Sequence, residues 1–273
     1  MKAIIITTAA TVLSLIISAL LIYFLLIRNK KTPKWKIAVA FVLSWVLCFF
    51  IGAFAYFGSY YHATDNALSY LNSTDEVSVN PLSYGYYFDG PGEGTAMIFY
   101  PGAKVEESAY AGVMYSLAEQ GIDCFLVKMP LHMAFMGKDR ADVVINEFGD
   151  DYENWYMAGH SLGGSMAAVY TVSHPYRDIK GLIFMASYSP APVSDGVKVL
   201  SILGSEDKVM SWDEYYSNLA NLPEGYTEVE ISGGNHGQFG DYGIQNGDGA
   251  AFISMEEQQR ISVDEIIKFV FNN

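Results

Sequence analysis

The pentapeptide Gly159-His160-Ser161-Leu162-Gly163 has the composition and spacing of a turn that presents a serine as a nucleophile. A serine hydroxyl attacks well only when a base removes its proton and a tight strand–turn–helix connection lifts it clear of its neighbours. The bare G-x-S-x-G pattern is weak, because about 0.2 matches arise by chance in a chain of this composition. A glycine-rich turn with a merely structural serine is the alternative.

The segments on both sides of Ser161 favour the nucleophile. Residues 154–158 (NWYMA) read as a strand that runs directly into the turn. Residues 162–173 read as a helix that opens with the small residues LGGSMAA, which allow close packing against neighbouring strands. The sequence therefore predicts Ser161 as the nucleophile of a hydrolytic site.

From Leu82 onward, strand-like and helical segments alternate along the chain. The predicted strands are 83–88, 96–100, 123–127, 155–158, 181–186, 198–203 and 227–231, and the predicted helices are 106–120, 138–147, 162–173, 212–222 and 256–271. Several strands are continuous apolar runs, typical of parallel strands covered on both faces. The alternation predicts an α/β fold with a mostly parallel, doubly wound sheet, whose ligands bind beyond the carboxyl ends of the strands.

With this turn and this order of elements, residues 82–271 resemble the α/β-hydrolase superfamily. The nearest likeness is to its compact branch of dienelactone-hydrolase-like and related esterase domains. The resemblance implies a serine esterase that works through an acyl-enzyme intermediate. It also implies that the partners of Ser161 follow along the chain in the order Asp or Glu, then His.

The order required by the family leaves two of the five histidines as candidates for the base. His174 ends the helix that begins at Ser161, so we expect it only to cap that helix. His236 lies in the glycine-rich turn 233–237 after the last predicted strand, where the family carries its base. We predict His236 as the base; an ordinary exposed loop histidine is the alternative.

The acid is predicted from the segment that follows strand 198–203. Asp207 lies three residues past Gly204, where the family places its acid. Its role there would be to fix the tautomer of the imidazole and to stabilise the imidazolium formed during attack. Glu206 is the nearest rival, and Asp195 is a more distant one.

An oxyanion hole needs backbone N–H groups aimed at the developing negative charge. The resemblance implies that Leu162 supplies one donor and the loop after strand 96–100 the other. In that loop Ala103 is the first choice and Lys104 the second. Many relatives carry His-Gly where this chain has Pro101-Gly102, and a simple Pro-Gly turn is the alternative interpretation.

The sequence predicts neither a cofactor nor a metal. It has no zinc-ligand spacing and no phosphate loop of the form G-x-x-x-x-G-K-[ST]. Segments 129–148 and 187–196 are too short to form a large lid, which favours a modest ester of a short acyl chain, a lipid or a sugar. Because the fold does not decide the activity, acyl transfer, thioester or peptide hydrolysis and a non-catalytic binding or sensor module stay alternatives.

Two uncharged runs near the N-terminus, 3–27 and 37–57, each reach the roughly 20 residues that a membrane-spanning helix needs. A cleaved signal peptide is the alternative for the first run. It would have an apolar region of only about 7–15 residues and a small-residue cleavage site. We predict a two-span hairpin in residues 1–60 that contacts membrane lipid, a stalk or linker over 61–81, and an α/β-hydrolase domain over 82–273.

Charge is unevenly distributed along the chain. Five of the six cations before residue 61 lie in the loop 28–36, which the positive-inside rule places in the cytoplasm, so the catalytic domain is expected outside it. All 30 acids lie from Asp65 onward, and the part after residue 60 has a net charge of −20. Such a charge repels phosphates, which argues against a nucleic-acid partner. Cys48 and Cys124 lie in a span and in a strand, so no disulfide between them is expected.

Overall fold

The computed structural model describes residues 2–24 and 33–272, which divide into two compact units, Met1–Ser59 and Tyr60–Asn273. In the first unit, α1 (Lys2–Ile22) and α2 (Lys34–Gly58) pack against each other. Within the described ranges, α2 is long and apolar enough to cross a membrane, with a mean hydropathy of 2.6, and Val12–Ile22 is a shorter apolar helical stretch. Length and composition thus support one candidate span, and part of the predicted run 3–27 lies outside the described residues.

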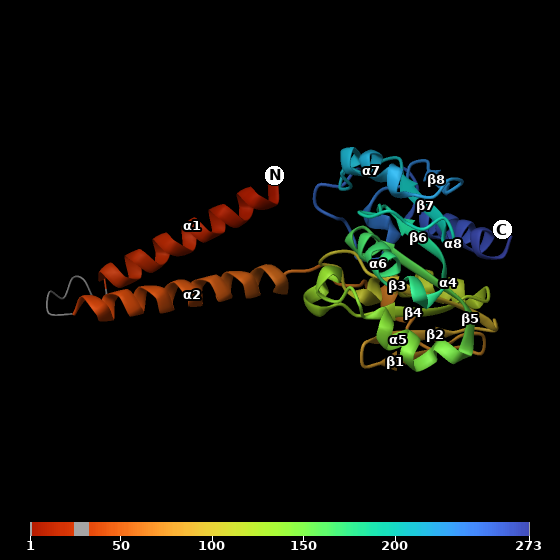
Figure 1. Cartoon of the computed structure of the whole chain (residues 1–273), viewed down its shortest axis with the longest axis horizontal. Coiled ribbons are helices and arrows are strands. Elements are labelled where there is room, and N and C mark those ends of the chain that lie inside the picture. The colour runs from red at the N-terminus through yellow and green to blue at the C-terminus, as the bar shows by residue number, and fades with distance from the viewer. Residues whose placement is uncertain (1, 25–32, 273) are drawn as a thin grey trace. The chain divides into compact units, whose positions relative to one another are not determined.

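The second unit is built on one eight-stranded sheet, with strand order β1-β2-β4-β3-β5-β6-β7-β8 (Figure 1). The strands are β1 (Ser78–Leu82), β2 (Gly85–Asp89), β3 (Gly94–Tyr100), β4 (Asp123–Val127), β5 (Tyr152–His160), β6 (Ile179–Met185), β7 (Lys198–Gly204) and β8 (Thr227–Ile231). β2 pairs antiparallel with β1 and β4, and the other neighbours pair in parallel. The predicted α/β class, with a mostly parallel sheet, is confirmed.

The segment predicted as a stalk or linker instead belongs to the folded unit. Residues 61–81 include the short helix α3 (Asp65–Ser69) and most of β1, which pairs with β2 across the full length of both strands. The prediction of one strand over 83–88 is therefore wrong in part, because the chain forms a hairpin there. Val77 and Val79 are buried, and the residues next to them in the sequence are polar. An alternation this short is too weak to predict a strand from the sequence.

Helices cover both faces of the sheet. They are α4 (Ala111–Glu119), α5 (Ala141–Phe148), α6 (Leu162–Ser173), α7 (Trp212–Asn218) and α8 (Met255–Phe271). Buried residues of α4 and α8 share one hydrophobic cluster, and those of α5 and α6 share a second cluster on the opposite face. The helix predicted over 106–120 begins instead with a 3-10 turn, Glu107–Tyr110, before α4 starts.

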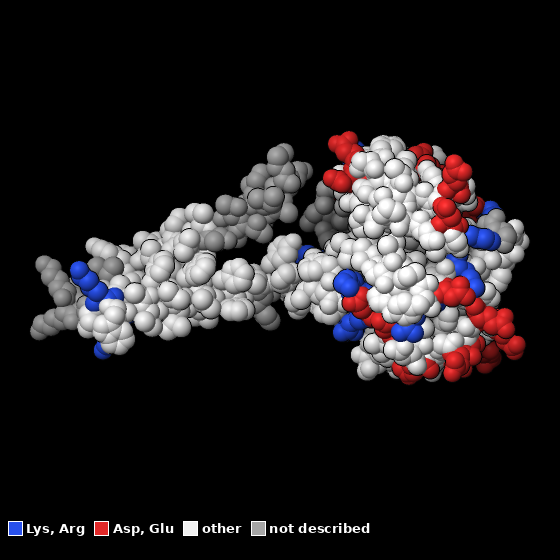
Figure 2. Space-filling model, in the orientation of Figure 1, with Lys and Arg blue, Asp and Glu red and all other residues white. Residues whose placement is uncertain are grey.

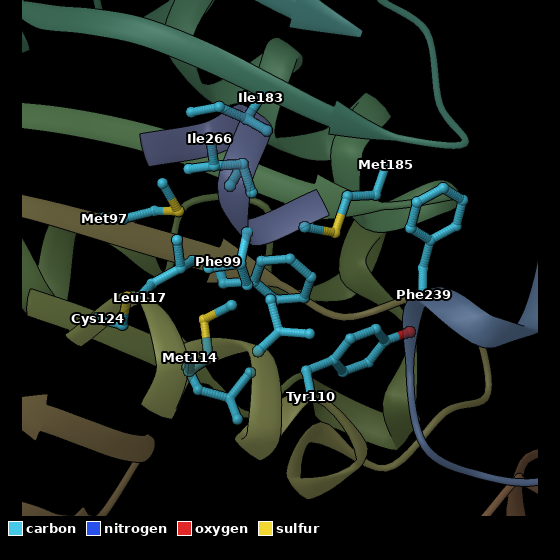
Figure 3. Close-up of a cluster of buried hydrophobic side chains, with 14 of the residues drawn as sticks. Met97, Phe99, Tyr110, Met114, Leu117, Cys124, Ile183, Met185, Phe239 and Ile266 are labelled. Atoms are coloured by element: carbon cyan, nitrogen blue, oxygen red, sulfur yellow. The ribbon is translucent and has the colours of Figure 1, made fainter. Parts of the chain in front are cut away.

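The surface of this unit is strongly acidic, as its net charge requires. Figure 2 shows acidic side chains around α7 and along the lower margin of the view. The interior is apolar: Met97 and Phe99 of β3 are fully buried toward the cluster of α4 and α8, whereas Ile98 is buried on the other face. Figure 3 shows Phe99 among Met114 and other large side chains of that cluster. Burial of each such side chain contributes about 2 kcal/mol, so the core holds the strand ends firmly.

Candidate active site

Ser161 lies at the turn between β5 and α6 in a strained backbone conformation, with φ 53° and ψ −126°. Such values are rare for a residue with a Cβ, and the strain of about 1–3 kcal/mol persists only where neighbouring contacts enforce it. Here the Ser161 N–H donates to the Met185 carbonyl at 2.9 Å, and the Ser187 hydroxyl donates to the Ser161 carbonyl at 2.6 Å. Strain of this kind is typical of a serine presented for nucleophilic attack.

The glycines that flank Ser161 are required by close backbone approaches. A Cβ on Gly163 would lie 2.1 Å from the Tyr100 carbonyl oxygen, and one on Gly159 would lie 2.5 Å from the Gly164 nitrogen. The loop after β3 is thereby pressed against the start of α6. This contact brings the loop that carries Ala103 toward Ser161 and Leu162.

Asp207 and His236 meet in the interior beyond the carboxyl ends of β7 and β8. The Asp207 Oδ2 lies 2.6 Å from the His236 Nδ1, and the two residues are 3% and 1% exposed. The other carboxylate oxygen, Oδ1, accepts the backbone N–H groups of Val209 and Met210, each at 2.8 Å. The carboxylate is thus fixed on one side by its own loop and directs its second oxygen at the imidazole.

The loop that carries His236 is anchored on two sides. Its Gly234 carbonyl accepts the Glu206 N–H at 2.8 Å, which ties it to the loop of Asp207. The fully buried Gln258 of α8 bonds the Asn235 N–H and carbonyl, at 2.9 and 2.8 Å. The role of Gln258 could not be predicted from the sequence, because nothing in the sequence around a helical glutamine indicates which loop it binds.

His236 also lies beside the strained turn. The centre of its ring is 4.5 Å from that of His160, the residue that precedes Ser161. Across the described residues, the Ser161 hydroxyl makes no hydrogen bond to His236. Bonds of this kind are often long without substrate and tighten when it binds. The structure brings Asp207 and His236 into contact and places His236 beside the residue that precedes Ser161; the three catalytic roles stay predictions.

The rival residues lie elsewhere or are engaged. The His174 Nδ1 lies 3.0 Å from the Tyr170 carbonyl at the end of α6, as a capping role requires. Asp195 is exposed just before the amino end of β7, at the opposite edge of the sheet. Glu206 is half-buried and accepts the Ser205 hydroxyl at 3.2 Å. In the described part of the chain, Asp207 is the member of this group that contacts His236.

Over the residues that the structure describes, the backbone N–H groups of Leu162 and Ala103, the predicted oxyanion donors, are free to bind an oxyanion, whereas that of Lys104 is not. Leu162 is the first residue of α6, where a helix leaves its N–H groups without partners and carries a partial positive charge. The Lys104 N–H is already bonded to the His132 carbonyl at 2.7 Å, which removes it as a donor. No partner for the Ala103 N–H is found among the described residues, which leaves Ala103 as the candidate in this loop.

A buried network that the sequence did not reveal lies behind the same loop. The Gly102 N–H donates to the Tyr110 hydroxyl at 3.1 Å, and that hydroxyl lies 2.8 Å from the His160 Nδ1. Because the tyrosine oxygen accepts from Gly102, its proton is free for His160, which favours the neutral tautomer with the proton on Nε2. Burial, and then the nearby His236, hold the pKa of His160 well below its ordinary value of 6.5. A neutral His160 leaves His236 free to take a proton.

This depressed pKa predicts acid sensitivity. Unfolded His160 takes up a proton near pH 6.5 but the folded protein does not, so its contribution to stability is complete above pH 6.5. It is lost as the pH falls, by up to about 1.4 kcal/mol per pH unit. Urea unfolding at pH 7.5 and 5.5 should show a smaller loss for His160→Asn than for the wild type. Replacement of the exposed His62 is the control, and an equal loss in His160→Asn would contradict the assignment.

No group of three or more His, Cys, Asp or Glu side chains able to hold a metal ion occurs in the described part of the chain. Of the two segments predicted to border the substrate, 129–148 forms two 3-10 turns and α5, and 187–196 is an irregular loop after β6. Neither forms a separate lid domain.

Comparison with known proteins agrees with this architecture. Residues 96–260 match the alpha/beta hydrolase family, to which the chain therefore belongs. No curated protein sequence matches the chain. Similar solved structures include carboxyl esterase 2 from the mycorrhizal fungus Tuber melanosporum (TM-score 0.55, 13% identity, 76% of this chain and 89% of the other). A hyperthermophilic esterase from Pyrobaculum calidifontis shares the fold with a TM-score of 0.52 and 15% identity, over 74% of this chain and 88% of the other. Est1E from Butyrivibrio proteoclasticus does so with a TM-score of 0.51 and 14% identity, over 72% of this chain and 98% of the other.

Proposed function

We propose that the protein is a membrane-anchored serine hydrolase that cleaves carboxylic esters through an acyl-enzyme, with Ser161 as nucleophile, His236 as base and Asp207 as acid. The observation that carries this proposal is the buried 2.6 Å contact between the Asp207 Oδ2 and the His236 Nδ1. The His236 ring lies 4.5 Å from that of His160, which precedes Ser161 in its strained strand–turn–helix connection. Membership of the alpha/beta hydrolase family supports it.

In acylation, the Ser161 Oγ attacks the ester carbonyl carbon while its proton passes to the His236 Nε2. The Asp207 carboxylate holds the Nδ1 proton of His236, so that Nε2 is the free base and the imidazolium is stabilised. The N–H groups of Leu162 and Ala103 bind the oxyanion of the tetrahedral intermediate. The intermediate collapses as His236 protonates the departing alcohol, which leaves an acyl group on Ser161.

Deacylation repeats these steps with water as the nucleophile. His236 takes a proton from the attacking water, the oxyanion forms again at the same two N–H groups, and the proton returns to the Ser161 Oγ as the acid leaves. The turnover therefore needs no cofactor.

The membrane attachment rests on α2, and we extend it to a two-span hairpin with α1, which packs against α2. The basic residues Lys34 and Lys36 at the start of α2 belong to the cation-rich loop that the positive-inside rule assigns to the cytoplasm. In this arrangement the unit Tyr60–Asn273 works outside the cytoplasm.

A fluorophosphonate probe tests the nucleophile directly, because it bonds covalently to a serine that an adjacent base activates. We expect peptide mass spectrometry of the full-length protein to find the label on Ser161, and Ser161→Ala to abolish it. Ser217→Ala, at an exposed serine of α7, is the control and should be labelled like the wild type. A folded wild-type protein that stays unlabelled at Ser161 would refute the proposal.

A further inference from the structure

The first residues of the folded unit are bonded to both loops that border the candidate site. The Tyr61 N–H donates to the Lys104 carbonyl at 2.7 Å, next to Ala103 of the predicted oxyanion hole. On its other side, the Tyr61 hydroxyl accepts the Asn246 N–H at 3.0 Å, in the segment that follows His236. The chain therefore enters this unit at the edge of the sheet that carries the site.

This entry point is close along the chain to the membrane-spanning candidate. Tyr60 stacks on His132 with their ring centres 3.8 Å apart, and Ser59 alone separates Tyr60 from Gly58, the last residue of α2. An extended residue spans about 3.5 Å, so the chain allows at most about 7 Å between Gly58 and Tyr60 in any orientation of the unit. If α2 crosses the bilayer, His132 and its neighbours stay near the lipid surface.

Large apolar side chains are exposed at the same edge, and we call them the apolar rim. Leu131, Phe135 and Met136 are 50%, 50% and 46% exposed in the segment around His132, and Ile244 is 94% exposed beside Asn246. The 3-10 turn Ala134–Met136 packs against α6, the helix that begins at the nucleophile turn. Single exposed apolar residues are ordinary, but several that border one site mark a contact with lipid or protein.

The charges around the apolar rim nearly cancel, in contrast to the acidic rest of the unit. Residues 128–140 carry Lys128, Lys138 and Arg140, but Lys128 is paired with the buried Glu107 at 3.1 Å and Lys138 with Asp139 at 2.7 Å. The unit as a whole has a net charge of −20. Elsewhere on the face shown in Figure 2, acidic side chains lie around α7 and along the lower margin. An anionic bilayer repels the acidic surface more than the nearly neutral rim, which turns the apolar rim toward the membrane.

We propose that the apolar rim inserts into the surface of the bilayer that α2 crosses, and that the substrate is a membrane-lipid ester that enters the site from that surface. The substrate half rests on the proposed function, since it assumes that Ser161 attacks an ester. The insertion half does not depend on catalysis. Short amphipathic surfaces of this kind bind the interface by burying apolar side chains beneath basic ones.

Insertion is tested with an environment-sensitive fluorophore on the full-length protein. The label is attached through Phe135→Cys or, as a matched control, Phe271→Cys, both in a Cys48→Ser background; Phe135 and Phe271 are each 50% exposed. The protein is placed in nanodiscs of phosphatidylcholine and phosphatidylglycerol, with and without nitroxide-labelled lipid. We expect about threefold stronger quenching at position 135 than at 271.

The substrate class is tested with two esters in the same nanodiscs, a water-soluble short-chain ester and a long-chain glycerol ester embedded in the bilayer. Phe135→Ser should lower the ratio of embedded-ester to soluble-ester hydrolysis about fivefold, and Phe271→Ser should leave the ratio unchanged. Unequal loss on the two esters separates a docking defect from general damage to the fold.

Each outcome decides one half of the proposal. Equal quenching at the two positions would overturn insertion, and shielding of the label from water without quenching by lipid would show that a second copy covers the apolar rim instead. Strong quenching with an unchanged ratio would overturn the lipid substrate alone. If the wild type hydrolyses neither ester and resists the fluorophosphonate, the proposed function fails while the quenching still reports on insertion.

Discussion

Replacing Ser161 by alanine is expected to lower kcat/KM for ester hydrolysis by at least about 10⁴-fold, because no covalent intermediate can form without the hydroxyl. The residual rate would come from the oxyanion donors and substrate binding alone. The fold should be unaffected, since the contacts that fix this turn are made by the Ser161 backbone N–H and carbonyl. The measurement is the steady-state hydrolysis of a short-chain chromogenic ester by the full-length protein.

The midpoint of urea unfolding should be the same for Ser161→Ala and the wild type, which separates loss of chemistry from loss of structure. Ser165→Ala, in the same helix, shows how the loss of a structural serine hydroxyl changes the urea midpoint. Ser165 is buried and donates its hydroxyl to the Tyr188 carbonyl at 2.8 Å, so its loss should cost about 1–3 kcal/mol of stability. A Ser161→Ala variant that keeps a tenth or more of the wild-type rate would remove Ser161 from the mechanism.

The sequence predicted the central elements of the fold well because their signals are local. The segments 162–173, 123–127 and 227–231 coincide with α6, β4 and β8 in the structure. β4 is buried along its whole length and α6 along one face, whereas in β8 the alternation of polar residues with Val229 and Ile231 is the signal, since only Ile231 is fully buried there. The edge of the sheet was harder: β1 contains Pro81 and polar residues, which an edge strand tolerates and which also resemble a linker.

In the candidate site, too, the residues identified by local sequence signals were predicted, and those that depend on long-range contacts were not. Asp207 and His236 could be selected from the sequence because each follows a strand, and the carboxyl ends of parallel strands meet at one edge. Tyr110 and Gln258 could not be, because their partners His160 and Asn235 lie far from them in the chain and meet them only in the folded protein. The engagement of the Lys104 N–H by His132 is likewise a tertiary contact, and it decides between two neighbouring donors.

The pattern of hydrogen bonds around Asp207 predicts a large effect for Asp207→Asn. The Val209 and Met210 N–H groups both donate to Oδ1, so the amide oxygen of an asparagine must take that place. Its NH₂ group then points at the His236 Nδ1, which lies 2.6 Å from the present Oδ2. An NH₂ donor requires Nδ1 to accept and moves the imidazole proton to Nε2, where the base must be free.

We therefore expect Asp207→Asn to lower kcat about 10³–10⁴-fold near neutral pH, although the side chain keeps its size and its two backbone bonds. Glu206→Gln is the matched control. Glu206 adjoins Asp207 in the chain, and its side chain bonds to Ser205 rather than to His236. Its rate should therefore stay within about twofold of the wild type. Ester hydrolysis and fluorophosphonate labelling should fall together in Asp207→Asn, since both need the base at His236. If Glu206→Gln were the inactive variant instead, the acid would be Glu206 and the contact of Asp207 with His236 would be structural.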